Sequence, residues 1–161
     1  MKTISFRPIR NDDNPGIAAI IKNILTEFGA NKPGTVYFDP TTDHLFQLFS
    51  ASDSAYYIAE VDGLIVGGSG IFPTPGLPAG CCELVKLYLL PEMRGLGLGF
   101  GLMNVCFQKA IEMGFHQMYL ETMPELSNAI GLYERTGFKY LDGPLGHSGH
   151  FGCDIWMIKN L

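Results

Sequence analysis

Glycine occupies every second position of the segment Arg94–Gly101, at residues 95, 97, 99 and 101. A strand-like stretch, ELVKLYLLPEM, precedes the segment, and a helix-like stretch, LMNVCFQKAIEM, follows it. The first amide groups of a helix lack partners within the helix and carry partial positive charge, so they attract anions. Glycine lets a phosphate approach these amides because it has no Cβ. The pattern therefore indicates a phosphate-binding loop; the alternative is a turn whose glycines allow close packing of helix on sheet.

Two common nucleotide-binding loops do not fit this segment. The dinucleotide fingerprint G-x-G-x-x-G fails because its third glycine position, counted from Gly95 or Gly97, falls on Phe100 or Leu102. The Walker A loop requires a Gly-Lys pair, which the chain lacks. A dinucleotide or nucleoside triphosphate is therefore disfavoured, while a loop for another nucleotide stays open as an alternative.

The rest of the chain supplies the elements that would position this loop. Alternating and helical spacings of apolar residues predict strands at residues 3–9, 81–90, 116–122, 138–141 and 150–160, and helices at residues 17–29, 41–51, 97–113 and 125–137. Residues 54–72 read as two strands joined by Asp62-Gly63, a strong hairpin signal. This order of elements predicts a mixed sheet with helices on both faces.

Two motifs resemble the GNAT superfamily of Gcn5-related N-acetyltransferases. The family loop, Q/R-x-x-G-x-G/A, is met by Arg94, Gly97 and Gly99. About 30 residues later, NAIGLYERTGF resembles N-x-x-A-x-x-L-Y-x-x-x-G-F, although its alanine follows Asn128 directly. The resemblance covers essentially the whole chain and is weakest at residues 10–55, where the acceptor usually binds in this family.

The resemblance implies an α/β (α+β) fold formed by a single domain over residues 1–161. Its mixed, mostly antiparallel central sheet would have about six or seven strands, splayed at the cofactor site and flanked by about four helices. The implied activity is transfer of an acetyl group from acetyl-CoA to a primary amine of a small molecule or peptide, by direct attack on the thioester. The alternative is a non-catalytic acyl-CoA-binding sensor of the same fold.

The resemblance assigns two residues to the chemistry of transfer, which needs a base for the amine proton and an acid for the departing thiolate. Glu83 is the candidate base; the alternative is a strand-edge carboxylate paired with Lys86. Strand parity places Val85 and Leu87 on the same face as Glu83. Tyr133 is the candidate acid, next to the coenzyme sulfur; the alternative is an aromatic residue packed into the core.

The resemblance also assigns the residues that would hold the coenzyme. Asn128 would hydrogen-bond the pantetheine arm; the alternative is a helix N-cap. The acetyl carbonyl would meet a backbone amide near Leu89, with Leu87 and Leu90 as neighbouring candidates. The implied coenzyme-binding set is Leu87, Leu89, Leu90, Arg94, Gly95, Leu96, Gly97, Leu98, Gly99, Asn128 and Tyr133.

His147, His150 and Cys153 form H-x-x-H-x-x-C, a spacing reminiscent of metal ligands. A structural zinc site generally needs four ligands, and no second pair lies nearby in the sequence. We therefore expect no metal here. A role at the mouth of the acceptor site stays open for the two histidines, beside exposed or packing roles.

The composition sets the remaining expectations. A net charge of -5 argues against a nucleic-acid partner, because phosphate contacts need a basic surface. No apolar run approaches the roughly 20 residues of a membrane span, and the N-terminus has no secretory h-region. Four cysteines, two of them adjacent, make a poor disulfide framework. We expect reduced thiols, a cytoplasmic location, no membrane partner, and a monomer or homodimer.

Overall fold

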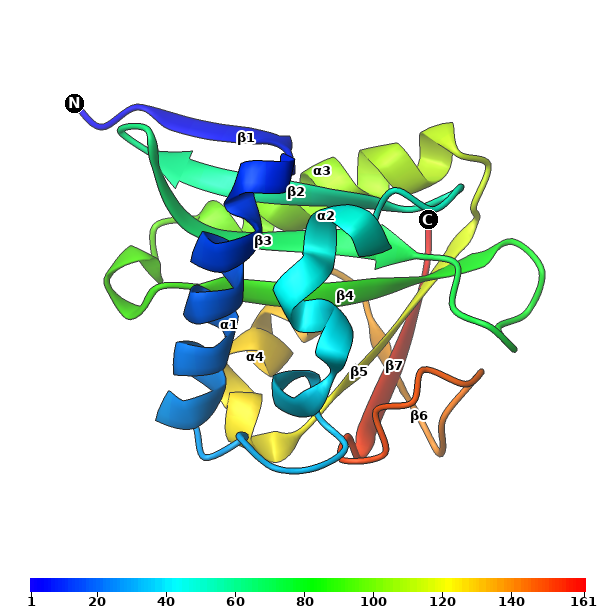
Figure 1. Ribbon diagram of the computed structural model, residues 1–161. Coiled ribbons are helices and arrows are strands. Elements are labelled where there is room, and N and C mark those ends of the chain that lie inside the picture. Colours follow the sequence, from blue (N-terminus) through cyan, green and yellow to red (C-terminus); the bar gives the residue numbers. More distant parts are fainter.

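The computed structural model describes residues 1–161, which form one seven-stranded sheet (Figure 1). In chain order the strands are β1 (Ile4–Pro8), β2 (Ala55–Val61), β3 (Leu64–Phe72), β4 (Cys81–Leu89), β5 (Gln117–Thr122), β6 (Lys139–Leu141) and β7 (Ile155–Asn160). They lie in the order β1-β2-β3-β4-β5-β7-β6, and only the β4–β5 pair is parallel. The predicted mixed, mostly antiparallel sheet is confirmed.

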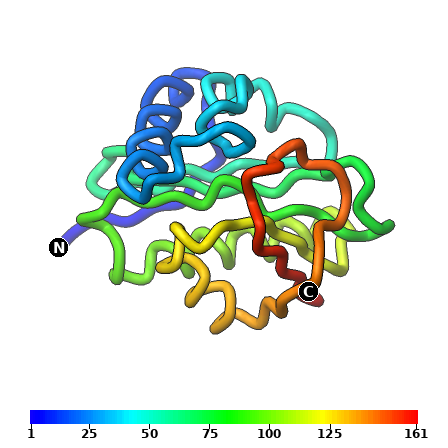
Figure 2. Tube along the Cα trace, turned by 90° about the horizontal axis from the view of Figure 1, so that it is seen from below, coloured from blue at the N-terminus to red at the C-terminus, as the bar shows by residue number.

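Four α-helices cover the sheet: α1 (Asn14–Glu27), α2 (Leu45–Leu48), α3 (Leu98–Glu112) and α4 (Ser127–Arg135). Figure 2 shows α1 and α2 on one face and α3 and α4 on the other. The order of strands and α-helices along the chain matches the predicted order. None of these helices combines the length and the apolar character that crossing a bilayer requires.

The Asp62-Gly63 hairpin is confirmed. The two residues join β2 to β3 with φ angles of +53° and +79°. Positive φ at both central residues belongs to the two-residue turn whose twist matches that of the flanking strands.

Two predicted elements differ from the structure. The helix expected over residues 41–51 is α-helical only at Leu45–Leu48, because Pro40–His44 forms a 3₁₀-helix. There the Asp39 carboxylate accepts a hydrogen bond from the Thr41 amide at 2.9 Å, and the Thr42 hydroxyl donates to a backbone carbonyl. Such local side-chain bonds compete with regular helix. The last strand begins at Ile155 instead of residue 150, since the Gly152 amide bonds to the Gly34 carbonyl, outside the sheet.

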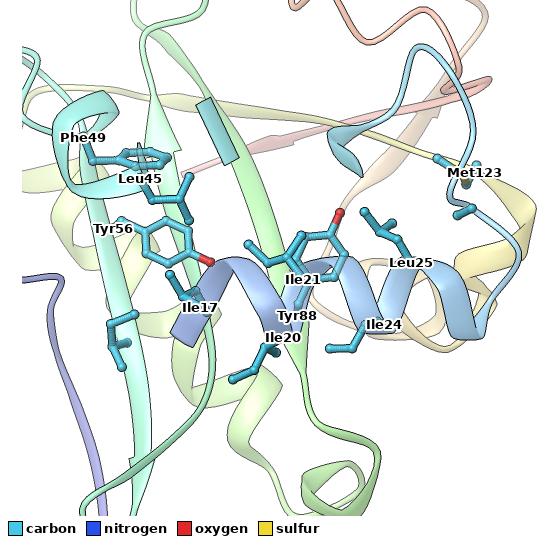
Figure 3. Packing of buried hydrophobic residues seen from close by; sticks show 12 residues of the cluster. Ile17, Ile20, Ile21, Ile24, Leu25, Leu45, Phe49, Tyr56, Tyr88 and Met123 are labelled. Atoms are coloured by element: carbon cyan, nitrogen blue, oxygen red, sulfur yellow. The ribbon is translucent and has the colours of Figure 1, made fainter. Parts of the chain in front are cut away.

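The core has two main clusters, one on each face of the sheet. Apolar residues of α1 and α2 pack on β2 and β4, and Figure 3 shows Ile21 and Leu25 of α1 beside Tyr88 of β4. On the other face, Met103 and Cys106 of α3 and Tyr133 of α4 pack on β4, β5 and β7. Burying both faces stabilises the sheet mainly through apolar area removed from water.

The sheet opens between β4 and β5. These strands pair over only three residues, from Cys81–Gln117 to Glu83–Tyr119. Beyond that point β4 continues to Leu89 and β5 to Thr122, but the two strands no longer pair with each other. The predicted splay is therefore present, and it begins at Glu83.

Candidate functional site

A cleft of about 610 Å³ runs along the opening between β4 and β5. Its walls come from β4, β5, α1, α4 and the glycine loop. The predicted site residues that line it are Glu83, Leu87, Leu89, Arg94, Gly95, Gly97, Gly99, Asn128 and Tyr133. Leu90, Leu96 and Leu98 are the predicted residues that do not. The structure thus brings one candidate set together from three stretches of the chain: β4, the glycine loop and α4.

The glycine loop presents the start of α3 to the cleft. Gly97 is the N-cap of α3 in the left-handed conformation, with φ of +81°, and no side chain caps the helix. Gly95 also has a positive φ, and a Cβ on either residue would meet no atom within 4 Å. The open amides at the positive end of the helix macrodipole are suited to a phosphate group.

Gly101 has a different role. A Cβ at this position would clash with the Phe6 ring of β1, so the glycine allows α3 to pack on the sheet. The alternation of four glycines therefore combines both explanations offered by the sequence. Gly95, Gly97 and Gly99 face the cleft, while Gly101 serves packing.

Arg94 fastens the loop to α1. Its guanidinium forms an ion pair with Glu27 at 2.9 Å and lies over the Phe28 ring, 4.9 Å from the centroid. Its Nε donates a hydrogen bond to the Leu89 carbonyl at 3.2 Å. The side chain still lines the cleft, so it contributes positive charge at the mouth while positioning the loop.

The three remaining leucines of the predicted set do not line the cleft. The Leu90 amide donates to the Val66 carbonyl at 2.9 Å, so it is not free for a ligand. Leu98 is buried in a third apolar cluster, and Leu96 is exposed. Leu96 and Leu98 can therefore contribute only backbone groups of the loop, and Leu87 and Leu89 remain the candidates on the strand.

Glu83 is buried where the two strands separate, with only 4% of its surface exposed. Its Oε1 accepts a hydrogen bond from the Thr74 hydroxyl at 2.5 Å. Burial, opposed by this bond, raises the pKa of Glu83 to about 7. The alternative of a strand-edge carboxylate paired with Lys86 is wrong, because Glu83 is neither exposed nor within ion-pair distance of the lysine.

A β-bulge interrupts β4 next to Glu83. Gly70 pairs with Val85 and Gly68 pairs with Tyr88, so Lys86 and Leu87 together oppose one residue of β3. Lys86 has φ of +54°, a backbone conformation that residues other than glycine rarely adopt. The extra residue reverses the parity of the strand. The expectation that Leu87 shares a face with Glu83 and Val85 is therefore wrong: Val85 packs toward α1, and Leu87 packs toward α3.

Tyr133 combines a packing role with access to the cleft. Its ring contacts Phe138 edge-on, with 5.9 Å between centroids, and only 7% of the residue is exposed. Its hydroxyl makes no hydrogen bond within the chain, and it is not among the side-chain polar atoms sealed from solvent without a partner. Burial raises the pKa of Tyr133 above its usual value. The hydroxyl therefore stays protonated and free to donate into the cleft.

Asn128 lies on the same helix, at the cleft. It is the second residue of α4 and is exposed, while the N-cap is Leu126, with no side-chain cap. The N-cap alternative for Asn128 is therefore wrong. Its side-chain amide is available for a ligand in the cleft.

A second cavity of about 200 Å³ adjoins the cleft and shares Glu83, Val85, Lys86 and His150 with it. His150 Nε2 lies 2.8 Å from Asp39 Oδ2, and the bond with His150 contributes most to lowering the pKa of Asp39. His147 lines the second cavity, and Cys153 lines the cleft. The described chain contains no group of three or more His, Cys, Asp or Glu residues that could hold a metal ion.

Sequence reasoning missed two residues that contact the predicted ones. Thr74 bonds Glu83 and Asp39 bonds His150, each from a loop that carries no recognisable motif. Their partners lie 9 and 111 residues away in the chain. Only the folded arrangement of the second cavity shows these contacts.

Comparisons with known proteins identify the chain as an acetyltransferase, in agreement with its fold. A model of the acetyltransferase (GNAT) family matches residues 19–138. The uncharacterised N-acetyltransferase YjgM of Escherichia coli is 43% identical over 158 residues, which cover 97% of this chain and 94% of YjgM. The chain belongs to the GNAT family and is an acetyltransferase.

Solved structures share the fold. A GNAT-family acetyltransferase from Staphylococcus aureus superposes with a TM-score of 0.84 at 19% identity, covering 99% of both chains. The PaiA N-acetyltransferase from Thermoplasma acidophilum, solved in complex with coenzyme A, superposes with a TM-score of 0.74 at 18% identity, again covering 99% of both chains. The Thermoplasma protein thus shows coenzyme A bound to a protein of this fold.

Gly99→Val is expected to weaken coenzyme binding by about tenfold or more, the scale of one lost charge-assisted hydrogen bond. A Cβ on Gly99 would lie 3.0 Å from Leu132 Cδ2, so the larger side chain crowds the passage between loop and α4. Calorimetric titration with coenzyme A measures the effect. Gly143→Val is the matched control, since a Cβ there meets no atom within 4 Å. Unchanged affinity in folded Gly99→Val would remove this glycine from the site.

Proposed function

We propose that the chain transfers an acetyl group from acetyl-CoA to a primary amine of a small molecule or peptide. The observation that carries this proposal is the position of Glu83, where the cleft meets the second cavity. The coenzyme would extend from the glycine loop along the opened strands, and the acceptor would enter from the second cavity. A carboxylate with a pKa near 7 stands where amine and thioester would meet.

In the proposed reaction, the amine nitrogen attacks the thioester carbonyl carbon while Glu83 accepts the amine proton. A general base works best when its pKa is close to the operating pH. An amide of the opened strand near Leu89 would donate to the developing oxyanion. The C–S bond then breaks, and the Tyr133 hydroxyl supplies the proton that the departing thiolate takes up.

The cysteines support direct attack on the thioester. All four are free, and burial raises the pKa of Cys153, the one that lines the cleft, to about 12. A thiol with so high a pKa is a poor nucleophile at neutral pH, because the thiolate is the reactive form. We propose that no acetyl-cysteine intermediate forms. The free thiols also agree with the cytoplasmic location that we expect.

Acetyl-CoA is expected to raise the melting temperature of the protein, because a ligand selective for the folded state stabilises it by RT ln(1 + [L]/Kd). ATP and NAD at the same concentration should give no comparable shift, since neither common nucleotide loop is present. A panel of primary amines should then release thiol from acetyl-CoA. Binding without thiol release from any amine would favour the sensor, and the absence of any melting shift would contradict the proposal as a whole.

A further inference from the structure

Lys86 points into the second cavity because of the bulge in β4. Without the extra residue, strand parity would put its side chain on the face opposite Glu83. The left-handed backbone at Lys86 instead keeps its side chain on the face of Glu83 and Val85, next to α2 and the loop before it. Strained backbone persists where the surrounding structure enforces it, and such positions cluster at functional sites. At Lys86 the Tyr56 hydroxyl stabilises the strained backbone by donating a hydrogen bond to the Lys86 carbonyl at 2.8 Å.

The Lys86 side chain is almost fully buried, and its ammonium group makes no hydrogen bond within the chain, although it is not among the polar atoms sealed from solvent. Its side chain is 4% exposed, and the nearest carboxylate oxygen, Asp39 Oδ2, lies 3.9 Å from Nζ. A buried charge without hydrogen-bonding partners is costly. Burial accordingly lowers the pKa of Lys86.

Asp39 faces this charge from 3.9 Å without a hydrogen bond to it, and both of its oxygens already bond other groups. Oδ1 accepts bonds from the amide and the hydroxyl of Thr41, at 2.9 and 2.6 Å. Oδ2 is bonded to His150 at 2.8 Å. The three N–H donors of the Lys86 ammonium are therefore available to a ligand. Lys86 lines the second cavity, where such a ligand would bind.

We infer that the acceptor is a primary amine that also carries a carboxylate, and that Lys86 binds this carboxylate while the amine reaches Glu83. The cavity volume of about 200 Å³ suits a molecule of amino-acid size, since pockets for drug-sized ligands begin at about 300 Å³. Glu83 and Lys86 stand three residues apart on one face of β4, so their spacing along the strand is at most roughly 10 Å. Both side chains reach into the space between, so one small bifunctional molecule can contact both. This inference rests on the proposed acetyl transfer and names its acceptor class.

The experiment compares acids with their amides. The protein amino acids other than proline and cysteine, together with β-alanine and γ-aminobutyrate, are each tested against the corresponding carboxamide, by thiol release from acetyl-CoA. For the accepted pairs, wild-type protein is expected to prefer the carboxylate by about 10- to 100-fold in kcat/KM, the scale of a hydrogen bond to a charged group. Lys86→Met should bring the ratio close to one. Lys109→Met, which removes an exposed lysine of α3, should keep the wild-type ratio.

A binding measurement separates this inference from the proposed transfer. The same pairs are titrated into the protein saturated with coenzyme A, and the melting temperature is followed. If no amine releases thiol, the proposed transfer fails, and the titration still decides the acceptor class. Carboxylates that bind wild type but not Lys86→Met support the inference. Equal responses to acid and amide, or a carboxylate preference that survives in folded Lys86→Met, would overturn it.

Discussion

Replacing Glu83 with glutamine is expected to lower kcat/KM for the amine by about 10²- to 10⁴-fold, the usual contribution of a general base. Glutamine has nearly the same shape and can still accept the Thr74 hydrogen bond, but it cannot take a proton from the amine. The affinity for coenzyme A should change little. Steady-state rates with a saturating acceptor, together with coenzyme titration, measure both quantities.

The pH profile shows whether the loss comes from the missing base. Because the pKa of Glu83 is about 7, wild-type kcat/KM should carry an inflection near pH 7, with the carboxylate active above it. Glu83→Gln should lack this inflection. Glu112→Gln, on the exposed side of α3, is the matched control and should keep it. A variant profile identical to that of wild type would exclude Glu83 as the base.

The same substitution has a predicted effect on stability, with the opposite sign. Glu83 titrates at 4.5 when unperturbed and at about 7 in the folded chain, so the folded state retains its proton longer. The stabilisation from the neutral carboxyl is complete below pH 4.5 and is lost as the pH rises through 7, by roughly 3 kcal/mol in all. Glutamine remains neutral, so Glu83→Gln should melt higher than wild type at pH 8 and similarly at pH 4. If the fold holds the Glu83 carboxylate in an unfavourable environment for catalysis, Glu83→Gln should be less active and more stable than wild type at pH 8.

The sequence predicts the architecture well because local signals and burial agree in most elements. Alternating apolar residues mark the sheet, and Asp62-Gly63 marks its hairpin through the positive φ angles that the turn requires. The short helix α2 escapes this logic. The side chains of Asp39 and Thr42 hydrogen-bond nearby backbone groups, and these bonds compete with regular α-helix. The spacing of apolar residues gives no sign of such bonds.

The candidate site is predictable only where it depends on contiguous motifs. The glycine loop, Asn128 and Tyr133 come from two such motifs, and all of them line the cleft. The proposed acceptor side depends instead on the bulge at Lys86, whose sequence, Val-Lys-Leu, carries no glycine or proline to mark it. One extra residue reverses the faces of the strand, and no periodicity argument anticipates it. The ion pair of Arg94 with Glu27 is similarly invisible, because it joins residues 67 positions apart.

Replacing Tyr133 with phenylalanine is expected to lower kcat by about 10- to 100-fold, at or below the usual range for a general acid, because the coenzyme A thiolate can also leave unaided. The substitution keeps the ring and its contact with Phe138. Since the hydroxyl makes no hydrogen bond within the chain, its loss should change the free energy of unfolding by no more than about 0.5 kcal/mol.

Measuring turnover and melting on the same Tyr133→Phe protein distinguishes catalysis from packing. Tyr140→Phe is the control, because that exposed tyrosine bonds Glu134 on the surface and lies outside the cleft. A buried structural hydroxyl would give the reverse result. Turnover would be unchanged, the free energy of unfolding would fall by about 0.5–1.5 kcal/mol, and the melting temperature would fall with it. We expect the first outcome, since Tyr133 packs in the core and lines the cleft, and its hydroxyl has no partner within the chain.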